Sequence, residues 1–369
     1  MITAHTDVVG SLLRPAELLR AREAREAGRM TAAAFKKIED EAVDEAVRLQ
    51  EAAGLEIVSD GEMRRLSFQS QMTEAVEGFG GWDLDAFLWG EWHGVEGAET
   101  WRTERPADLG VTGKLTRRRH LSSEEFVYLR GRTGRIPKVT LPSPGLFANF
   151  WSADISRHAY PTLDGFLADV VRILKEEVEE LARLGASYIQ IDAPHYPLLL
   201  DPATRAFYES RGWTLGEWLE RGIEFDNAVI DGVPGVTFGF HLCRGNQNNR
   251  WLVEGGYEAI AEPIFRGIRA ERLLLEYDDA RSGSFAPLAQ VGDDRMVVLG
   301  LVSTKRPALE EPELLARRID EAARYIDKER LALSTQCGFS TSIIGNAPSL
   351  EAEKAKLRLV AEVARRVWG

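Results

Sequence analysis

Cysteine is scarce in this sequence. Only two of its 369 residues are cysteines, Cys243 and Cys337. Two widely separated cysteines exclude the dense disulfide framework of small secreted proteins, and in a reducing compartment both remain thiols that can bind a metal. The sequence also lacks an apolar run of about 18 residues that could cross a bilayer, and its first residues, MITAHTDVVGS, lack the pattern of a secretory signal. We therefore expect a cytoplasmic protein with no membrane partner.

Positive charge is also in short supply. Lysine and arginine number 46 against 58 acidic residues, which gives a formal net charge of -12. A general affinity for nucleic acid or anionic membranes needs an excess of basic residues on one face, so the composition argues against both partners. The local cluster Arg117, Arg118 and Arg119 is typical of a solvated face, with a clamp for an anionic group of a ligand as the alternative. No feature of the sequence specifies an oligomeric state.

Helical and strand patterns alternate along most of the chain. A helix is expected after Thr31, where an alanine-rich stretch ends at Gly54. Thr214 and Glu217 form a capping-box pattern for a second helix, and another is expected from Pro312. Short apolar segments separate the helices, a pattern typical of parallel strands buried on both faces. The expected strands lie near residues 55–60, 137–142, 187–193, 234–242, 272–277, 296–302 and 331–336.

An eighth strand near residues 2–10 would close this sheet into a (β/α)8 TIM barrel, and we predict one α/β catalytic domain over residues 1–369. A doubly wound open sheet is the alternative, but the Gly-x-Gly-x-x-Gly that typically follows its first strand is missing. Residues 64–136 interrupt the alternation with a stretch rich in glycine and tryptophan, GFGGWDLDAFLWGEWHGVEGAETW. A long insertion after an early strand is typical of a lid or substrate wall, with aromatic packing on the barrel or on a second subunit as the alternative.

The stretch GVTFGFHLCRGN places a histidine and a cysteine at the end of an expected strand. Side chains two positions apart on a strand point the same way, so His241 and Cys243 can meet at one point. Alone, this pair is typical of a buried, hydrogen-bonded core. Glu276 and Cys337 also follow apolar strands, and a buried carboxylate needs a partner or a metal. An imidazole, two thiols and a carboxylate at the mouth of one barrel suit Zn2+.

Several motifs resemble, in the same order, those of the catalytic domain of cobalamin-independent methionine synthase. The resemblance includes H-x-C at 241–243, LEYDDARSG around Glu276 and STQCGFST around Cys337, and it extends over nearly the whole chain. Its other motifs are GS at 10–11, DGE at 60–62, TLPSP at 140–144, FWS at 150–152 and IQIDAP at 189–194. The resemblance implies a barrel that holds zinc through His241, Cys243, Glu276 and Cys337.

The chemistry of that family implies a substrate thiol that joins the metal, with one protein ligand loosened to admit it. Zinc lowers the pKa of the thiol, so that a thiolate exists at neutral pH and attacks an electrophilic carbon. In the synthases this carbon is the methyl group on a folate nitrogen, and the thiol is homocysteine. The resemblance therefore implies zinc-dependent methyl transfer to homocysteine, which gives methionine.

Further residues match substrate contacts of the family. Glu62 and Asp192 match acids that hold the ammonium group of an amino acid, and Ser11 matches a contact to its carboxylate. A general acid/base pair formed by the two acids, or a turn-capping role for Asp192, is the alternative. Trp151 matches an aromatic residue that stacks on the pterin, with a plain core position as its alternative. His195, close to Asp192 in sequence, has no match.

The sequence departs from the folate-dependent synthases in two ways. Those enzymes carry a similar N-terminal half that helps to hold the folate tail, whereas this chain corresponds to the catalytic half. They also have a histidine proton donor where this chain has Lys305, a candidate catalytic residue better suited to holding an anion than to releasing a proton at pH 7.

These departures leave other alkyl donors open. Methylcobalamin is one, and an epoxide, as in epoxyalkane:coenzyme M transferase, is another. In either case Lys305 and the cluster at 117–119 could hold a sulfonate or a carboxylate. A non-catalytic zinc- or thiol-binding barrel is the remaining alternative.

Overall fold

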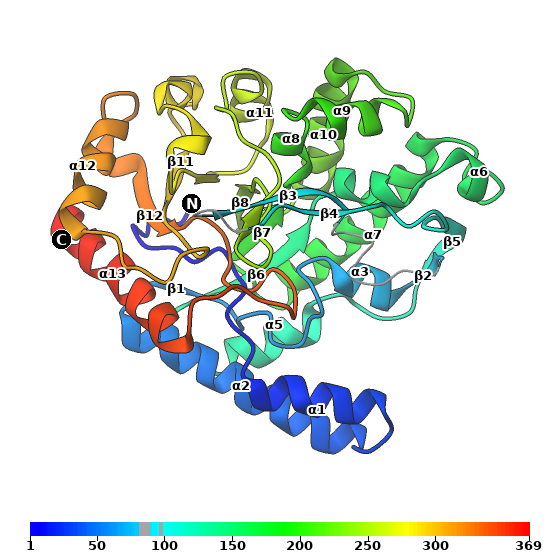
Figure 1. Ribbon diagram of the computed structural model, residues 1–369, viewed down its shortest axis with the longest axis horizontal. Helices are drawn as coiled ribbons and strands as arrows, with labels where there is room; N and C mark the ends of the chain where they lie inside the picture. The colour runs from blue at the N-terminus through cyan, green and yellow to red at the C-terminus, as the bar shows by residue number, and fades with distance from the viewer. Residues whose placement is uncertain (81–88, 96–98) are drawn as a thin grey trace.

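Seven parallel strands form one curled sheet at the centre of the molecule (Figure 1). The computed structural model describes residues 1–80, 89–95 and 99–369. The sheet order is β1-β6-β7-β8-β10-β11-β12, and every neighbouring pair is parallel. These strands are β1 (Ile57–Val58), β6 (Ile136–Pro142), β7 (Tyr188–Asp192), β8 (Thr237–Leu242), β10 (Arg272–Glu276), β11 (Met296–Val302) and β12 (Leu331–Thr335). Each falls on one of the seven strands expected from the sequence.

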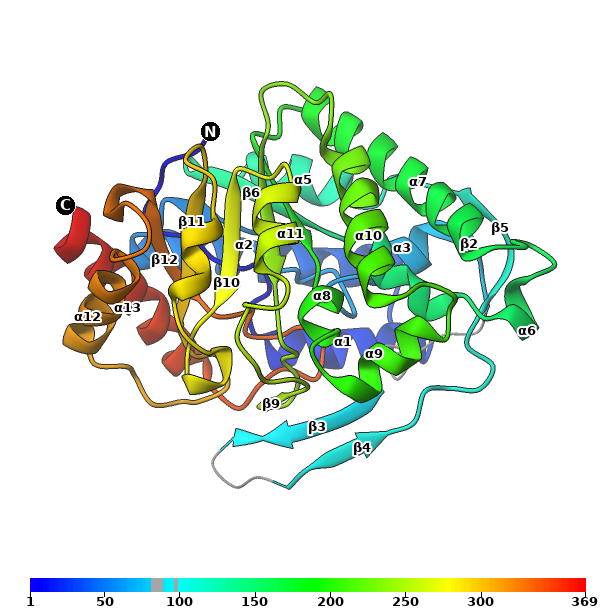
Figure 2. The same ribbon diagram turned by 90° about the horizontal axis from the view of Figure 1, so that it is seen from above.

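Helices surround the sheet and cover its outer face (Figures 1 and 2). The longest are α2 (Ala32–Ala53), α7 (Leu163–Arg183), α10 (Leu215–Ile230) and α13 (Leu350–Trp368). The shorter helices are α1 (Ala16–Glu26), α3 (Ser70–Ala75), α5 (Ser123–Arg130), α6 (Ala153–Ser156), α8 (His195–Leu198), α9 (Pro202–Glu209), α11 (Ala261–Gly267) and α12 (Pro312–Ala322). None of the helices in the described ranges is long and apolar enough to cross a membrane.

The helix ends follow the capping signals in the sequence. The Thr31 side chain accepts a hydrogen bond from the backbone N–H of Ala34 at the start of α2, and Gly54 ends that helix with a φ of 90°. At α10, Thr214 and Glu217 make both hydrogen bonds of a capping box. Because these bonds satisfy backbone groups that a helix end leaves unpaired, they fix where each helix begins or ends.

The N-terminal segment lies between β12 and β1 without forming a regular strand. Thr6 makes a single parallel bridge to Leu333, and the backbone N–H of Leu333 donates to His5 O at 2.9 Å. On the other side, the Glu56 carboxylate accepts from the backbone N–H of Thr6 at 3.3 Å, where a sheet would use a backbone carbonyl. The expected eighth strand is thus reduced to one bridge, and the described residues form a curled parallel sheet without a continuous eight-stranded ladder.

A buried polar network anchors this segment inside the sheet, at the amino ends of β7 and β10. The Asp7 carboxylate accepts hydrogen bonds from Lys138 Nζ at 2.8 Å, Tyr188 Oη at 2.7 Å and Arg272 Nη2 at 3.1 Å. Burial alone would raise the pKa of Asp7, but the Lys138 and Arg272 charges hold it below its ordinary value. Two ion pairs and one hydrogen bond therefore tie residue 7 to three strands.

The insertion at residues 64–136 folds beside the carboxyl ends of the sheet. It contains β2 (Val76–Phe79) paired with β5 (Val111–Arg117), and β3 (Gly90–Gly94) paired with β4 (Trp101–Thr103). Strand β3 also pairs with β9 (Arg250–Trp251), which belongs to the loop after β8, and Figure 2 shows β3 and β4 crossing the outside of the molecule beside β9. Part of the glycine- and tryptophan-rich stretch, at 81–88 and 96–98, lies outside the described residues.

Candidate active site

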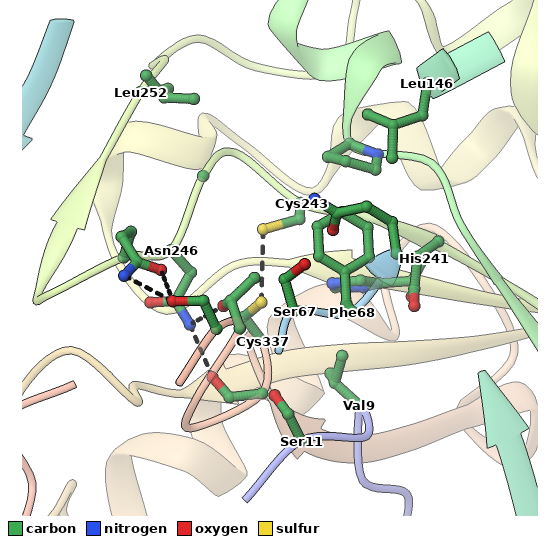
Figure 3. A pocket seen from close by; sticks show the side chains of 18 of the residues that line it. Val9, Ser11, Ser67, Phe68, Leu146, His241, Cys243, Asn246, Leu252 and Cys337 are labelled. Carbon is green, nitrogen blue, oxygen red and sulfur yellow. Dashed lines mark hydrogen bonds between the residues drawn. The ribbon is translucent and has the colours of Figure 1, made fainter. Parts of the chain in front are cut away.

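A cavity lies at the carboxyl ends of the parallel strands and spans about 860 Å³ when the adjoining open solvent is included. Asp192 is the last residue of β7, His241 is the second-last residue of β8, and Cys337 follows β12. Figure 3 shows how the side chains converge on this space. The polar residues of the lining include Ser11, Glu62, Asp192, His241, Cys243 and Cys337. An apolar group includes Phe68, Trp92, Leu146, Leu198 and Leu252.

The imidazole of His241 and the thiols of Cys243 and Cys337 form a compact donor group. Their candidate ligand atoms all lie within 4.8 Å of one another, and the two sulfurs are 3.5 Å apart (Figure 3). His241 Nδ1 lies 3.3 Å from the carbonyl oxygen of Leu274, so a proton on Nδ1 leaves the Nε2 lone pair available. Nε2 is buried and has no hydrogen-bonding partner in the described chain. One nitrogen and two sulfurs at this spacing fit Zn2+ with a fourth position left open.

The two buried thiols differ in acidity because they contact each other. The hydrogen bond between the sulfurs raises the pKa of Cys243 well above its ordinary value and lowers that of Cys337 well below it. Burial would lower the pKa of His241, but the contact with the Cys337 sulfur raises it above its ordinary value. Cys337 is therefore the first of the two thiols to lose its proton. The resulting thiolate is the form that binds a metal.

Glu276, expected as a fourth metal ligand, faces other partners. Its Oε1 accepts from Lys305 Nζ at 3.1 Å and from Arg281 Nη2 at 3.4 Å. Its Oε2 accepts from the backbone N–H of Arg244 at 3.0 Å. Burial would raise the pKa of Glu276, but the charges of Lys305 and Arg281 lower it. Among the described residues, Glu276 is not part of the compact donor group.

A tight turn aims the Glu62 carboxylate at the cavity. Gly61 and Glu62 both have left-handed backbones, with φ of 69° and 55°. A positive φ is strained for glutamate, and such strain concentrates at functional sites. Oε1 of Glu62 accepts from Thr140 Oγ1 at 2.8 Å, whereas the buried Oε2 has no partner in the described ranges. A side chain at Gly10 would meet Oε1 at 2.7 Å, which explains the need for glycine there.

Asp192 and Ser11 complete the polar part of the cavity lining. Burial raises the pKa of Asp192 to about 7, and Gln190 Nε2 donates to its Oδ1 at 2.7 Å. Ser11 packs against Gly338, where a Cβ would lie 2.0 Å from the serine Oγ. The structure thus brings together Ser11, Glu62 and Asp192 with the donor group, as the sequence motifs had indicated.

Lys305 and Trp151, two further residues expected at the site, lie outside the cavity lining. Neither is among the described residues that line the cavity. Lys305 is fully buried against Glu276. Trp151 belongs to the hydrophobic core, where its Nε1–H donates to the carbonyl oxygen of Tyr160 at 3.1 Å. Among the described tryptophans, the one that lines the cavity is Trp92, on β3 of the insertion.

The basic cluster and His195 also lie away from the cavity lining. Arg117 pairs with Glu176 at 3.1 Å, Arg118 with Glu77, and Arg119 with Glu74 at 3.7 Å. These ion pairs favour a solvated face over a clamp for an anionic group of a ligand. His195 is buried, and neither ring nitrogen has a partner in the described chain. Burial lowers the pKa of His195 to about 3, so its ring is neutral.

Several lining residues were not identified from the sequence. Ser67, Phe68, Gln69 and Trp92 come from the insertion, and Asn246 and Gln247 from the loop after the H-x-C motif. The buried Ser67 Oγ and both ends of the Gln69 amide have no partner in the part of the chain described. Loop polar residues carry no periodic signal, so only the glycine- and tryptophan-rich composition pointed to this region.

Comparison with known proteins accords with this geometry. Residues 3–366 match the family model described as "Cobalamin-independent synthase, Catalytic domain". The chain is 34% identical over 368 residues to the uncharacterized protein YxjH of Bacillus subtilis, covering 98% of this chain and 94% of that protein. It is 27% identical over 334 residues to a methionine synthase of Pyrococcus abyssi, covering 90% of this chain and 85% of that one.

Solved structures show the same fold. The putative vitamin-B12 independent methionine synthase from Listeria monocytogenes aligns with a TM-score of 0.73 at 24% identity, covering 99% of this chain and 98% of that one. A B12-independent methionine synthase from Shewanella sp. W3-18-1, in complex with selenomethionine, also aligns with a TM-score of 0.73, at 19% identity and with 99% and 97% of the two chains covered.

Proposed function

This chain belongs to the cobalamin-independent synthase family, matching its catalytic domain, and from that membership we propose that it is a zinc-dependent methyltransferase that methylates homocysteine to give methionine. The observation that carries the proposal is the composition of the cavity. Two carboxylates, Glu62 and Asp192, line it together with the imidazole and the two thiols. This set matches a substrate that carries both a thiol and an ammonium group. The cytoplasmic location stays a prediction.

Zinc would be held by His241, Cys243 and Cys337, with Glu276 as the further ligand expected from the sequence. The fit rests on the buried, unpaired Nε2 of His241 and on the short distance between the sulfurs. When bound, the metal would lower the pKa of the substrate thiol, so that the sulfur is nucleophilic at neutral pH.

The carboxylates orient the amino acid. The unpaired Oε2 of Glu62 and the Asp192 carboxylate can both accept from an ammonium group, while Ser11 Oγ can donate to the substrate carboxylate. A bound ammonium favours the ionised form of Asp192, whose pKa is raised to about 7 chiefly by burial. Fixing the two groups on the α-carbon directs the sulfur, at the other end of the substrate, toward the donor group.

The same lining disfavours a thiol that carries a sulfonate. No lysine or arginine lines the cavity among the residues that the structure describes. Lys305 is paired with Glu276, and the cluster at 117–119 is paired with glutamates. A sulfonate would therefore face two carboxylates without a counter-charge, so the epoxyalkane:coenzyme M transferase alternative has no support in the cavity.

The insertion at residues 64–136 is proposed as a substrate wall. Its Phe68 and Trp92 side chains line the cavity and would exclude water from the reacting sulfur. Trp92 also offers an aromatic face for a planar methyl donor.

Product analysis tests this function. The purified zinc-loaded protein is incubated with L-homocysteine and either methyl-tetrahydrofolate or methylcobalamin, and methionine is measured by mass spectrometry. We expect methionine from one of these donors and none from the Cys337→Ser variant. Zinc-loaded protein that forms no methionine from either donor would contradict the proposal.

A further inference from the structure

Two polar residues of the insertion line the cavity without a partner for their side chains. The Ser67 hydroxyl and both ends of the Gln69 amide are buried and make no hydrogen bond in the described chain. Figure 3 shows the Ser67 and Phe68 side chains directed into the space that His241 and Cys243 also face. Burial of an amide without a hydrogen bond is unfavourable. A ligand that pairs with these groups would relieve that cost.

The two other side-chain amides of the described cavity lining are satisfied within the protein. Asn246 uses both ends of its amide, donating at 2.7 Å to a backbone carbonyl and accepting at 2.9 Å from another asparagine. Gln247 and Ser342 exchange two hydrogen bonds, at 2.9 and 3.1 Å. Among the lining residues that the structure describes, Gln69 therefore differs from both in having its whole amide unpaired.

The backbone that carries these side chains is fixed by hydrogen bonds. The Phe68 N–H donates to the Thr341 carbonyl at 3.0 Å. The Ile343 N–H donates to the Leu66 carbonyl at 2.8 Å. Residues 66–68 are thus paired with the loop after β12. A ligand would find the two polar side chains already in place, so binding would not require the ordering of a loop.

An unpaired glutamine amide has a specific complement. Its oxygen accepts one hydrogen bond and its nitrogen donates one in the same plane, so it matches an adjacent N–H and C=O, much as glutamine matches the donor and acceptor of adenine. The Phe68 and Trp92 side chains line the same cavity and offer flat apolar faces. A planar heterocycle that contains a cyclic amide, or lactam, meets both requirements.

From these contacts we infer that Ser67 and Gln69 determine the specificity for the second substrate, the methyl donor, by binding the lactam edge of a planar heterocycle. Gln69 Oε1 accepts from the lactam N–H, Gln69 Nε2 donates to the lactam carbonyl, and the Ser67 hydroxyl binds a further polar atom of the ring. The inference rests on the proposed function. It selects a heterocyclic donor over methylcobalamin, whose amides are open-chain.

Fluorescence titration with two non-reactive probes tests the inference. The zinc-loaded protein is titrated with pterin, a planar lactam, and with 3-methylpterin, in which a methyl group replaces the lactam hydrogen. The Kd of pterin should rise about 10- to 100-fold in Gln69→Leu and about 3- to 10-fold in Ser67→Ala. Methylation of the probe should weaken binding about tenfold or more in the wild type but less than about threefold in Gln69→Leu, because the variant no longer contacts the N–H.

A matched glutamine separates recognition from folding. Gln71 is buried, is not among the described lining residues, and donates to both oxygens of Glu125 at 3.0 and 3.1 Å. Gln71→Leu should lower the thermal unfolding temperature and leave the Kd of pterin within about threefold. Gln69→Leu removes an unpaired amide, so the unfolding temperature of the ligand-free variant should stay the same or rise. A fall as large as that of Gln71→Leu would show that the amide is paired inside the folded chain and would overturn the inference.

The outcomes distinguish this inference from the proposed function. An unchanged Kd of pterin in Gln69→Leu, or a larger loss for methylcobalamin than for pterin, would overturn the inference and leave homocysteine methylation intact. A Kd of L-homocysteine that rises as much as that of pterin would assign Gln69 to the amino acid and overturn it as well. A loss confined to pterin supports the lactam subsite. Absence of methionine formation would overturn the proposed function, whereas the Kd of pterin tests the subsite by itself.

Discussion

The two ends of the curled sheet both bury charged groups, but they treat them differently. At the amino ends, both oxygens of Asp7 are hydrogen-bonded, and Lys138 reaches Asp7, Gln190 and the Val8 carbonyl. At the carboxyl ends, His241 Nε2, Glu62 Oε2 and the Gln69 amide have no partner among the described residues. These three residues line the cavity, so their unpaired polar groups are available to a ligand. The charged groups at the amino ends stabilise the fold, whereas those at the carboxyl ends remain available to a substrate.

Cysteine substitution at the carboxyl end should have the largest effect on function. Cys337→Ser removes one of two sulfur donors, so zinc stoichiometry should fall well below one and the methyl-transfer rate should fall by about three orders of magnitude. Atomic absorption and steady-state assays check both. The unfolding free energy of the metal-free variant should stay within about 1 kcal/mol of the wild type, because no structural ion pair is lost. Full zinc occupancy in the variant would contradict the assigned donor group.

A substitution at the amino end should do the opposite. Asp7→Asn leaves Lys138 and Arg272 without their buried anion, so the unfolding free energy should fall by about 3–5 kcal/mol. Denaturant titration measures the loss, and exposed Asp293→Asn is the control, expected to change stability by less than about 0.5 kcal/mol. Zinc bound per folded molecule should not change.

The pH dependence of that variant sharpens the comparison. The folded pKa of Asp7 is held below its ordinary value by Lys138 and Arg272. Its stabilising contribution is therefore present above the unfolded pKa and is lost as the pH falls through the folded pKa. The stability gap between wild type and Asp7→Asn should narrow on acidification. A gap that widens in acid would contradict the ion-pair account.

Loss of a cavity carboxylate should affect binding more than stability. Glu62→Gln removes the charge at the unpaired Oε2 but keeps an acceptor for Thr140, so the Kd for homocysteine should rise about 10- to 100-fold. Affinity for 4-mercaptobutyrate, which lacks the ammonium group, should hardly change. Calorimetry with both thiols checks this, and equal losses for the two would show that Glu62 does not recognise the ammonium.

The smallest effect is expected at the apolar part of the cavity lining. Trp92→Leu removes an aromatic face, so the KM for a planar methyl donor should rise about 3- to 10-fold, with little change for homocysteine. The matched variant Trp151→Leu alters the core and should lower thermal stability without changing that KM. If Trp151→Leu raises the KM while Trp92→Leu does not, the assignment of the two tryptophans is reversed.

The sequence was most informative where local physics decides structure. Apolar runs and capping residues located all seven strands of the sheet and the ends of α2 and α10. The H-x-C spacing and the cysteine after β12 predicted three side chains that the structure brings together. These signals depend on near neighbours in the chain, so they can be read without the fold.

Contacts between distant segments could not be predicted in the same way. The pairing of Glu276 with Lys305 depends on the positions of β10 and the end of β11, and the choice between Trp92 and Trp151 depends on how the insertion packs. The N-terminal segment reads as a strand, but its Asp7 is drawn into a side-chain network in place of a regular ladder. Each outcome is a competition between tertiary partners that a linear pattern does not encode.

Zinc-edge X-ray absorption on the zinc-loaded protein, before and after addition of homocysteine, tests the central claim most directly. The account predicts one zinc per chain with two sulfur ligands, rising to three when homocysteine binds. A shell that stays at two sulfurs with saturating homocysteine, or protein that binds no zinc, would contradict thiol activation at His241, Cys243 and Cys337.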